Sequence, residues 1–168
     1  MRHRGSGRLA QALGPKDMRI VLVSFAFALS MLMAVQAVAS DIADAMAPLR
    51  QFVDGFNKGD LKAAVAACAE EASVIDDFPP HEWQGAGCAK WADGFEAIAK
   101  KEGITDASII LGKPRHVDVT GDHAYIVVPV TLITKHNGKP KKLPSMFTAS
   151  LHKETGGWRI TGWAWADL

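Results

Sequence analysis

The sequence predicts one α+β domain in which three helices and a short strand precede a long antiparallel sheet, with a separate apolar segment ahead of the domain. Two observations predict this order. Apolar residues recur at helical spacing up to about residue 103, and beyond it they fall in strand-like runs separated by turn signals. The length of 168 residues suits a single domain of ordinary size.

The helical half divides into three segments. Between residues 40 and 56 the apolar positions are spaced four, three, four and three apart, which marks one face of a helix. Asp60 is a suitable N-cap for a second helix that runs toward Cys68. Residues 73–75 read as a brief strand, and residues 76–87 as a loop. A third helix follows, with Trp91, Phe95 and Ile98 facing inward and Gly103 at its end.

The remaining residues are expected to form strands. Residues 108–119 read as one strand, in which Pro114 indicates an edge position or a bulge. Residues 124–135 are apolar at nearly every position, so both faces of that strand must be covered. Asn137-Gly138 is a strong hairpin signal. Two further strands, at residues 146–153 and 158–165, complete an antiparallel meander.

The apolar run at residues 20–39 predicts a secretory signal peptide. Arg19 precedes it, and Ala37-Val38-Ala39 closes it with the small-x-small pattern of a signal-peptidase site. We therefore expect cleavage near Ala39 and a secreted or periplasmic domain at residues 40–168. A retained membrane anchor is the alternative, because about twenty residues can span a bilayer. Met18 is a second candidate start, which would make residues 1–17 an over-extended reading frame.

Charge and cysteine content limit the partners. Five of the 19 basic residues and one of the 18 acidic residues precede residue 20, so residues 40–168 carry a net charge of −3. A mildly acidic domain has no electrostatic footprint for nucleic acid, and membrane contact is expected only during export. Export also favours a disulfide between Cys68 and Cys88, although two separate buried thiols remain the alternative.

Three segments resemble motifs of the nuclear transport factor 2-like superfamily, which includes the ketosteroid isomerases and the SnoaL-like polyketide cyclases. They are Phe56-Asn57-Lys58-Gly59-Asp60-Leu61, residues 69–76 (AEEASVID) and Gly157-Trp158-Arg159-Ile160. The resemblance spans nearly all of residues 41–166. It implies a curved antiparallel sheet wrapped on three helices, a cystatin-like cone with a pocket at its open end. It also implies a homodimer formed through the sheet.

The resemblance makes Asp76 the leading candidate for a catalytic residue. In the ketosteroid isomerases an aspartate at the end of this first strand is the general base, and Asp76 matches that position. Nearby aromatic side chains would raise its pKa and make it a better base. His81, in the same loop, is a weaker candidate acid, base or ligand contact. The alternative is a solvated turn whose carboxylates accept backbone N–H groups.

The same resemblance contains a departure from the isomerases. Phe52 stands where those enzymes have a tyrosine, and Ala149 stands where they have a protonated aspartic acid. Neither side chain can donate a hydrogen bond, and loss of one oxyanion donor typically costs about 3–4 kcal/mol of transition-state stabilisation. Steroid isomerase activity is therefore not expected.

The aromatic residues predict an apolar pocket and an outer interface. If the cone fold holds, six aromatic side chains reach the pocket: Phe52, Phe56, Trp83, Trp91, Tyr125 and Phe147. Trp163 and Trp165 share one face of the last strand, and they are expected on the outer side of the sheet as a dimer face.

The sequence leaves three functions open. The first is a pocket protein that binds a small apolar or amphipathic molecule. The second is an isomerase, dehydratase or cyclase that uses Asp76 as its base. The third is a homodimeric association module without catalysis. The histidines show no ligand spacing, so no metal site is expected, and no cofactor motif is present.

Overall fold

The computed structural model describes residues 40–168. The predicted signal segment, residues 1–39, lies outside the described residues. Within residues 40–168, no helix combines the length and apolar character needed to cross a bilayer.

Helices occupy the predicted places. Residues 40–45 are helical and lead into α2 (Ala47–Asn57), followed by α3 (Leu61–Val65) and α4 (Gly87–Glu102). Asp60 caps α3 as expected, because its side chain accepts the Ala63 N–H at 2.9 Å. Gly103 ends α4 with a φ of 66°, a left-handed conformation in which glycine has no steric penalty. The element types and their order therefore follow from local signals.

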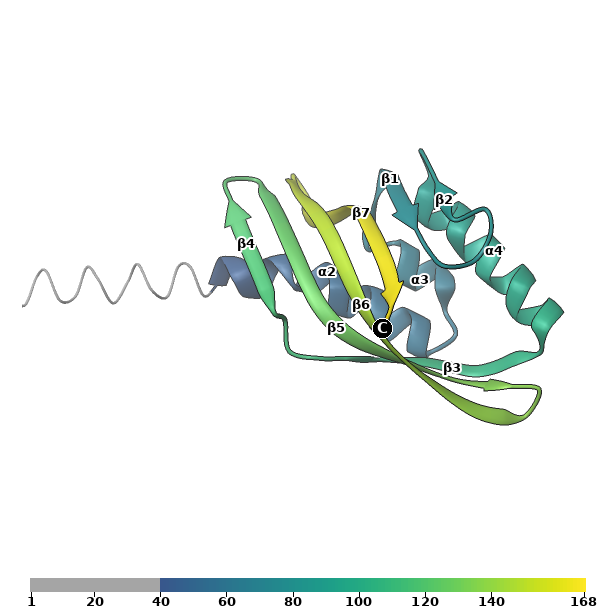
Figure 1. Cartoon of the computed structure of the whole chain (residues 1–168). Helices are drawn as coiled ribbons and strands as arrows, with labels where there is room; N and C mark the ends of the chain where they lie inside the picture. Colours follow the sequence, from purple (N-terminus) through teal and green to yellow (C-terminus); the bar gives the residue numbers. More distant parts are fainter. Residues whose placement is uncertain (1–39) are drawn as a thin grey trace, which may run out of the picture. The chain divides into compact units, whose positions relative to one another are not determined.

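Seven strands form one curved sheet (Figure 1). Their order is β2-β1-β7-β6-β5-β3, and β4 also pairs with β5. The strands are β1 (Cys68–Ile75), β2 (Glu82–Trp83), β3 (Ile104–Leu111), β4 (His116–Thr120), β5 (His123–His136), β6 (Lys139–Glu154) and β7 (Gly157–Asp167). Asn137 and Gly138 form the β5–β6 turn with positive φ, as the hairpin signal predicts. The fold is the α+β cone expected from the resemblance.

The strands differ from the expected arrangement in four places. β1 begins at Cys68, which was expected on the second helix, and β2 lies within the predicted loop at residues 76–87. The single strand predicted at residues 108–119 is two strands, β3 and β4, which pair with different halves of β5. Between them the Gly112 N–H donates to the Pro129 carbonyl, so the chain stays attached to β5 while its direction changes. In addition, β1 runs parallel to β7, whereas the meander predicts antiparallel pairs alone.

The helices lie on one side of the sheet (Figure 1) and enclose the core with it. Leu49 and Phe52 of α2 are almost completely buried, as are Ile126, Leu151 and Ile160 of the strands. Burying a side chain of this size contributes roughly 1.5–3 kcal/mol.

A disulfide joins the first strand to the last long helix. Cys68 begins β1, Cys88 lies in the first turn of α4, and their sulfur atoms are bonded. The expected bridge is confirmed. It holds α4 beside β1, which are the two elements that carry Asp76 and Trp91.

Candidate functional site

The central polar group of the site is the carboxylate of Asp76. Side chains alternate along β1, so Val74 is buried, Ile75 is exposed and Asp76, just past the strand, turns inward. Its side chain is only 8% exposed. The Asp76 N–H donates to the His81 carbonyl at 3.1 Å, which closes the following loop back onto the strand end. The carboxylate therefore does not lie in a solvated turn.

Two N–H groups hold the carboxylate of Asp76. The indole Nε1–H of Trp91 donates to Oδ2 at 2.6 Å, and the backbone N–H of Asp77 donates to Oδ1 at 2.7 Å. Burial raises the pKa of Asp76 from 3.8 to about 7. The two hydrogen bonds oppose this rise, and the neighbouring Asp77 adds to it. A group with a pKa near neutrality can both accept and return a proton.

Asp76 borders a cavity that is otherwise mostly apolar, with a volume of about 60 Å³. The other polar lining residues are Asp77 and Asp167. The Asp167 carboxylate is already bonded, because Ser145 Oγ donates to it at 2.8 Å and Trp165 Nε1 at 3.0 Å. An apolar cavity of roughly 150 Å³ can hold benzene, so the cavity alone fits only a small group.

A groove of about 150 Å³ adjoins this cavity. The two share five lining residues, namely Asp77, Phe78, Phe95, Leu132 and Leu143. The groove also has a polar rim with Glu102, Thr134, His136 and Lys141. Cavity and groove together offer an apolar interior that ends in polar groups.

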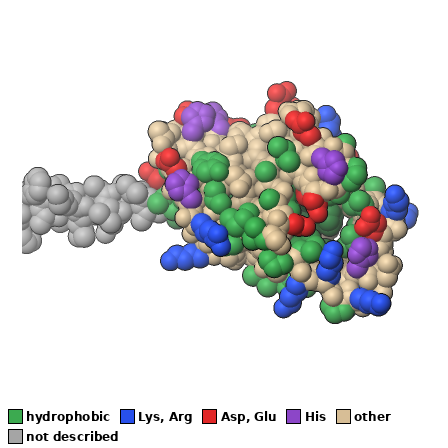
Figure 2. All heavy atoms as spheres, in the orientation of Figure 1, with side chains coloured by type: hydrophobic (Ala, Val, Ile, Leu, Met, Phe, Trp, Pro, Cys, Tyr) green, Lys and Arg blue, Asp and Glu red, His purple; other side chains and the backbone are tan. Residues whose placement is uncertain are grey.

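Over the face shown in Figure 2, charged and histidine side chains are interspersed with apolar ones and do not form one large patch of a single charge.

Trp163 lies at the centre of the aromatic wall. Its ring stacks on Phe147, with centroids 5.3 Å apart, and meets Trp91 edge-on at 4.9 Å. Phe52 packs against the same indole at 5.7 Å. The Trp163 N–H is buried and has no hydrogen-bond partner among residues 40–168. A buried donor without a partner costs about 1–3 kcal/mol.

The structure brings four of the six predicted aromatic residues to the cavity: Phe52, Phe56, Trp91 and Phe147. Trp83 is buried beside the cavity and packs on Phe78, with ring centroids 5.0 Å apart. Tyr125 was placed wrongly. It lies on the outer face of β5 and is 47% exposed, because Ala124 and Ile126 take the inward positions of the alternating strand.

The predicted orientation of Trp163 and Trp165 was also wrong. Trp163 is 4% exposed, and both side chains line the cavity. The cause is an irregularity in the ladder: Leu151 pairs with Ile160 but Ser150 pairs with Gly162, so Thr161 is an extra residue. Such a bulge reverses the alternation. Ile160 and Trp163 therefore both point inward, and the outer surface proposed from the two tryptophans does not exist.

Other predicted residues occupy less central places. The exposed His81 has its Nδ1 3.2 Å from the Asp76 backbone carbonyl, and it does not line the cavity. Phe52 lines the cavity without a polar group, and the buried Ala149 does not reach it. The two donors of the steroid isomerases therefore have no counterpart at these positions.

Several lining residues were not predicted. Phe78 follows Asp76 and Asp77 in the loop and lines the cavity beside them. Phe95 was expected to face inward from α4, one turn after Trp91, and that spacing could have placed it in the cavity. Leu132, Leu143 and Asp167 come from the three neighbouring strands β5, β6 and β7, and the register of these strands brings them to the cavity.

A family model described as a SnoaL-like domain matches residues 46–164. The chain belongs to this SnoaL-like family. It is thereby a member of the nuclear transport factor 2-like superfamily, as the resemblance implied. A search of the curated proteins found no match.

Solved structures agree with this SnoaL-like assignment at the level of the fold. A nuclear transport factor 2-like protein with a cystatin-like fold from Novosphingobium aromaticivorans has a TM-score of 0.66 at 20% identity, over 83% of this chain and 90% of that chain. A protein of unknown function from Mycobacterium tuberculosis has a TM-score of 0.66 at 15% identity, over 80% of this chain and 75% of that chain. A ketosteroid isomerase-like protein from Erwinia carotovora atroseptica has a TM-score of 0.62 at 14% identity, over 76% of this chain and 96% of that chain.

Proposed function

We propose that this SnoaL-like domain binds a small apolar or amphipathic molecule, with the apolar part in the cavity and a polar end in the adjoining groove. The observation that supports this most directly is an aromatic cavity with one deeply buried carboxylate, Asp76, at its wall. Ligand sites of this kind are mostly apolar with few polar groups that fix orientation. The polar end would lie near Lys141, which makes no ion pair with another described residue within the salt-bridge distance.

The size of the space limits the ligand. The cavity of about 60 Å³ and the groove of about 150 Å³ are too small for a steroid nucleus unless the walls move. A single ring or a short chain that reaches from Trp163 to the groove rim fits better.

We infer a second function, proton transfer at a carbon next to a carbonyl, from the state of Asp76. With a pKa of about 7, this carboxylate is partly ionised at neutral pH and borders a mostly apolar cavity. An isomerase, a dehydratase or a cyclase each needs such a base. The oxyanion donor that Phe52 and Ala149 cannot supply could come from the unpartnered N–H of Trp163, provided that its side chain turns toward the ligand.

Export and self-association remain proposals. The Cys68–Cys88 bridge fits an oxidising compartment outside the cytoplasm, which supports export through the predicted signal peptide. A homodimer is still expected from the family resemblance. Its predicted surface has lost its basis, because Trp163 and Trp165 face the cavity. Light scattering coupled to size-exclusion chromatography would measure the subunit number directly.

The binding proposal is tested by native mass spectrometry of the protein purified from its own host. The expected result is a co-purifying small molecule with an apolar body and a polar end. Leu143→Trp should abolish its retention, because Leu143 lines both the cavity and the groove. Met146→Trp is the matched control, since Met146 lies on the opposite face of β6. Equal retention by both variants would contradict binding in the cone.

The identified molecule then separates binding from catalysis. If Asp76 is the base, Asp76→Asn should lower turnover by at least about a hundredfold while the molecule is still retained. Trp163→Phe should lower turnover more than binding, because it removes the N–H while an aromatic ring, although smaller, stays in the cavity wall. Unchanged turnover in Asp76→Asn would contradict the role of Asp76 as the base and would leave ligand binding as the proposed function.

A further inference from the structure

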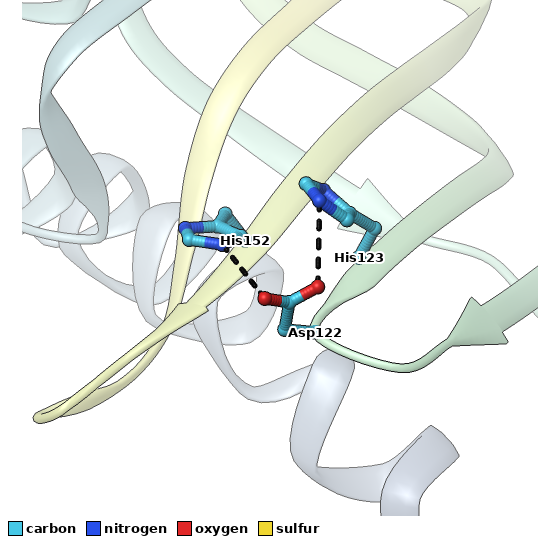
Figure 3. Close-up of polar contacts among 3 residues, drawn as sticks. All are labelled: Asp122, His123 and His152. Atoms are coloured by element: carbon cyan, nitrogen blue, oxygen red, sulfur yellow. Dashed lines mark hydrogen bonds and ion pairs between the residues drawn. The ribbon is translucent and has the colours of Figure 1, made fainter.

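A second cluster of polar side chains lies on the outer face of the sheet, away from the cavity. It consists of Asp122, His123 and His152 (Figure 3), and none of the three lines the cavity or its groove. All three are accessible: their side chains are 63%, 72% and 39% exposed, respectively. No ligand spacing is visible among the histidines in the sequence, because His123 and His152 are far apart in the chain.

The sheet itself brings these residues together. His123 of β5 and His152 of β6 are direct partners in the antiparallel ladder, so their side chains emerge side by side on one face. Their ring centroids are 4.8 Å apart. Asp122 precedes β5 in the turn after β4, and the Lys153 N–H donates to its carbonyl at 2.8 Å. The backbones of the two histidines are therefore held by regular strand pairing, and the turn residue Asp122 is held by one hydrogen bond to the neighbouring strand.

The side-chain atoms are spaced as metal ligands are. His123 Nε2 lies 3.4 Å from Asp122 Oδ1, and His152 Nε2 lies 3.3 Å from Asp122 Oδ2. The three ligand atoms all fall within 4.8 Å of one another. Zinc ligands at 2.0–2.1 Å in a tetrahedron are about 3.4 Å apart. The separations in this cluster are therefore close to those between the ligands of one zinc ion.

The donor set indicates which ion. Two imidazole nitrogens and one carboxylate oxygen suit Zn²⁺, Ni²⁺ and Cu²⁺, whereas Ca²⁺ and Mg²⁺ prefer oxygen ligands alone. Without a metal ion, the carboxylate of Asp122 contacts each of the two imidazole rings directly. The two possibilities use the same atoms and differ in whether a proton or a metal ion lies among them.

We propose that Asp122, His123 and His152 form a surface site for a divalent transition-metal ion such as Zn²⁺, with water in the remaining coordination position. Three protein ligands and one open position are the arrangement in which zinc keeps an exchangeable ligand. Because the site is exposed, its affinity is expected to lie well below that of a buried structural zinc site. Cu²⁺ should bind more tightly than Zn²⁺.

The test is calorimetric titration of the tag-free protein with Zn²⁺, and with Ca²⁺ as the contrasting ion. One Zn²⁺ per chain is expected, together with no measurable Ca²⁺ binding. His123→Ala and His152→Ala should each weaken Zn²⁺ binding at least about tenfold. His116→Ala is the matched control, because His116 lies on the neighbouring strand β4, next to Tyr125, outside the cluster.

A second measurement identifies the ligands independently of affinity. Co²⁺ should give the visible absorption of a four-coordinate site in the unmutated protein and in His116→Ala, and neither His123→Ala nor His152→Ala should give it. All these side chains are accessible, so circular dichroism should show the same fold in every variant. Zn²⁺ binding that survives the double variant His123→Ala, His152→Ala would overturn the proposal, and so would an unmutated protein that binds Zn²⁺ no better than Ca²⁺.

Discussion

The indole N–H of Trp91 donates to Oδ2 of Asp76 at 2.6 Å, and this bond links α4 to the end of β1 inside the cone. Both side chains are buried and line the cavity. The bond fixes the carboxylate at the cavity wall and stabilises its ionised form. Burial acts in the opposite direction and is the stronger influence, so the pKa is about 7 rather than near 4.

Replacing Trp91 should therefore raise the pKa of Asp76 further. A hydrogen bond to a charged group is worth about 1.5–3 kcal/mol, which corresponds to about 1–2 pH units. Trp91→Phe removes the N–H donor and leaves a smaller aromatic ring at the position. A carbon-13 NMR titration of the labelled Asp76 carboxyl would measure the change.

Asp77→Asn is the control, because it should shift the pKa of Asp76 in the opposite direction. The negative charge of Asp77 raises the pKa of Asp76, and its backbone N–H remains in the variant. The pKa of Asp76 should therefore fall. A Trp91→Phe variant whose Asp76 pKa stays near 7 would mean that the indole bond does not form in solution.

The pKa of Asp76 also predicts how stability depends on pH. The folded state holds the proton more tightly than the unfolded chain, whose pKa is near 3.8. Between about pH 4 and 7 the folded state binds more protons, so the free energy of unfolding falls as pH rises. This contribution is fully present below pH 4 and is lost as pH passes about 7. Its full size is on the order of 4 kcal/mol.

Asp76→Asn should remove this contribution, because asparagine does not titrate. The NH₂ group of the asparagine would face either the Trp91 N–H or the Asp77 N–H, and two donors cannot bond each other. The variant should therefore be less stable than the unmutated protein at pH 4.5. The difference should shrink or reverse by pH 7.5. Urea unfolding at several pH values measures it, and parallel stability curves for the two proteins would contradict the raised pKa.

The disulfide should account for a large part of the domain's stability. It closes a loop with a sequence separation of 20 residues, which is worth about 3 kcal/mol on the chain-entropy model. The double variant Cys68→Ala, Cys88→Ala should lose about that amount in urea unfolding. A reducing agent should destabilise the unmutated protein similarly and leave the double variant unchanged. A reducing agent without effect on the unmutated protein would show that the bridge does not form.

Local signals in the sequence were sufficient for the three helices and for the β5–β6 hairpin, and the family resemblance singled out one central residue of the site, Asp76. The Asp60 cap, Gly103, Asn137-Gly138 and the position of Asp76 at a strand end all depend on neighbours a few residues away. The position of Asp76 could thus be predicted without the cavity that it lines.

Phase and pairing could not be predicted in the same way. Both faces of β5 are apolar, so nothing in the sequence decides that Ala124 points inward and Tyr125 outward. His123 and His152 become neighbours only through the register of β5 and β6. The bulge at Thr161 has no local signal except the glycine that follows it, and it is this bulge that turns Trp163 into the cavity.

Gly162 should be required at this bulge. A Cβ atom here would lie 2.8 Å from Ser73 Oγ and 3.1 Å from Ser150 Oγ, because β7 is flanked closely by β1 and β6 at this point. Gly162→Ala should therefore cost about 1–3 kcal/mol of stability through crowding. Ser73→Ala removes the nearer oxygen, so the double variant Gly162→Ala, Ser73→Ala should lose less than the sum of the two single variants. A urea double-mutant cycle measures this coupling. Strictly additive losses would mean that β1 does not approach the bulge so closely, and the inward position of Trp163 would then need another cause.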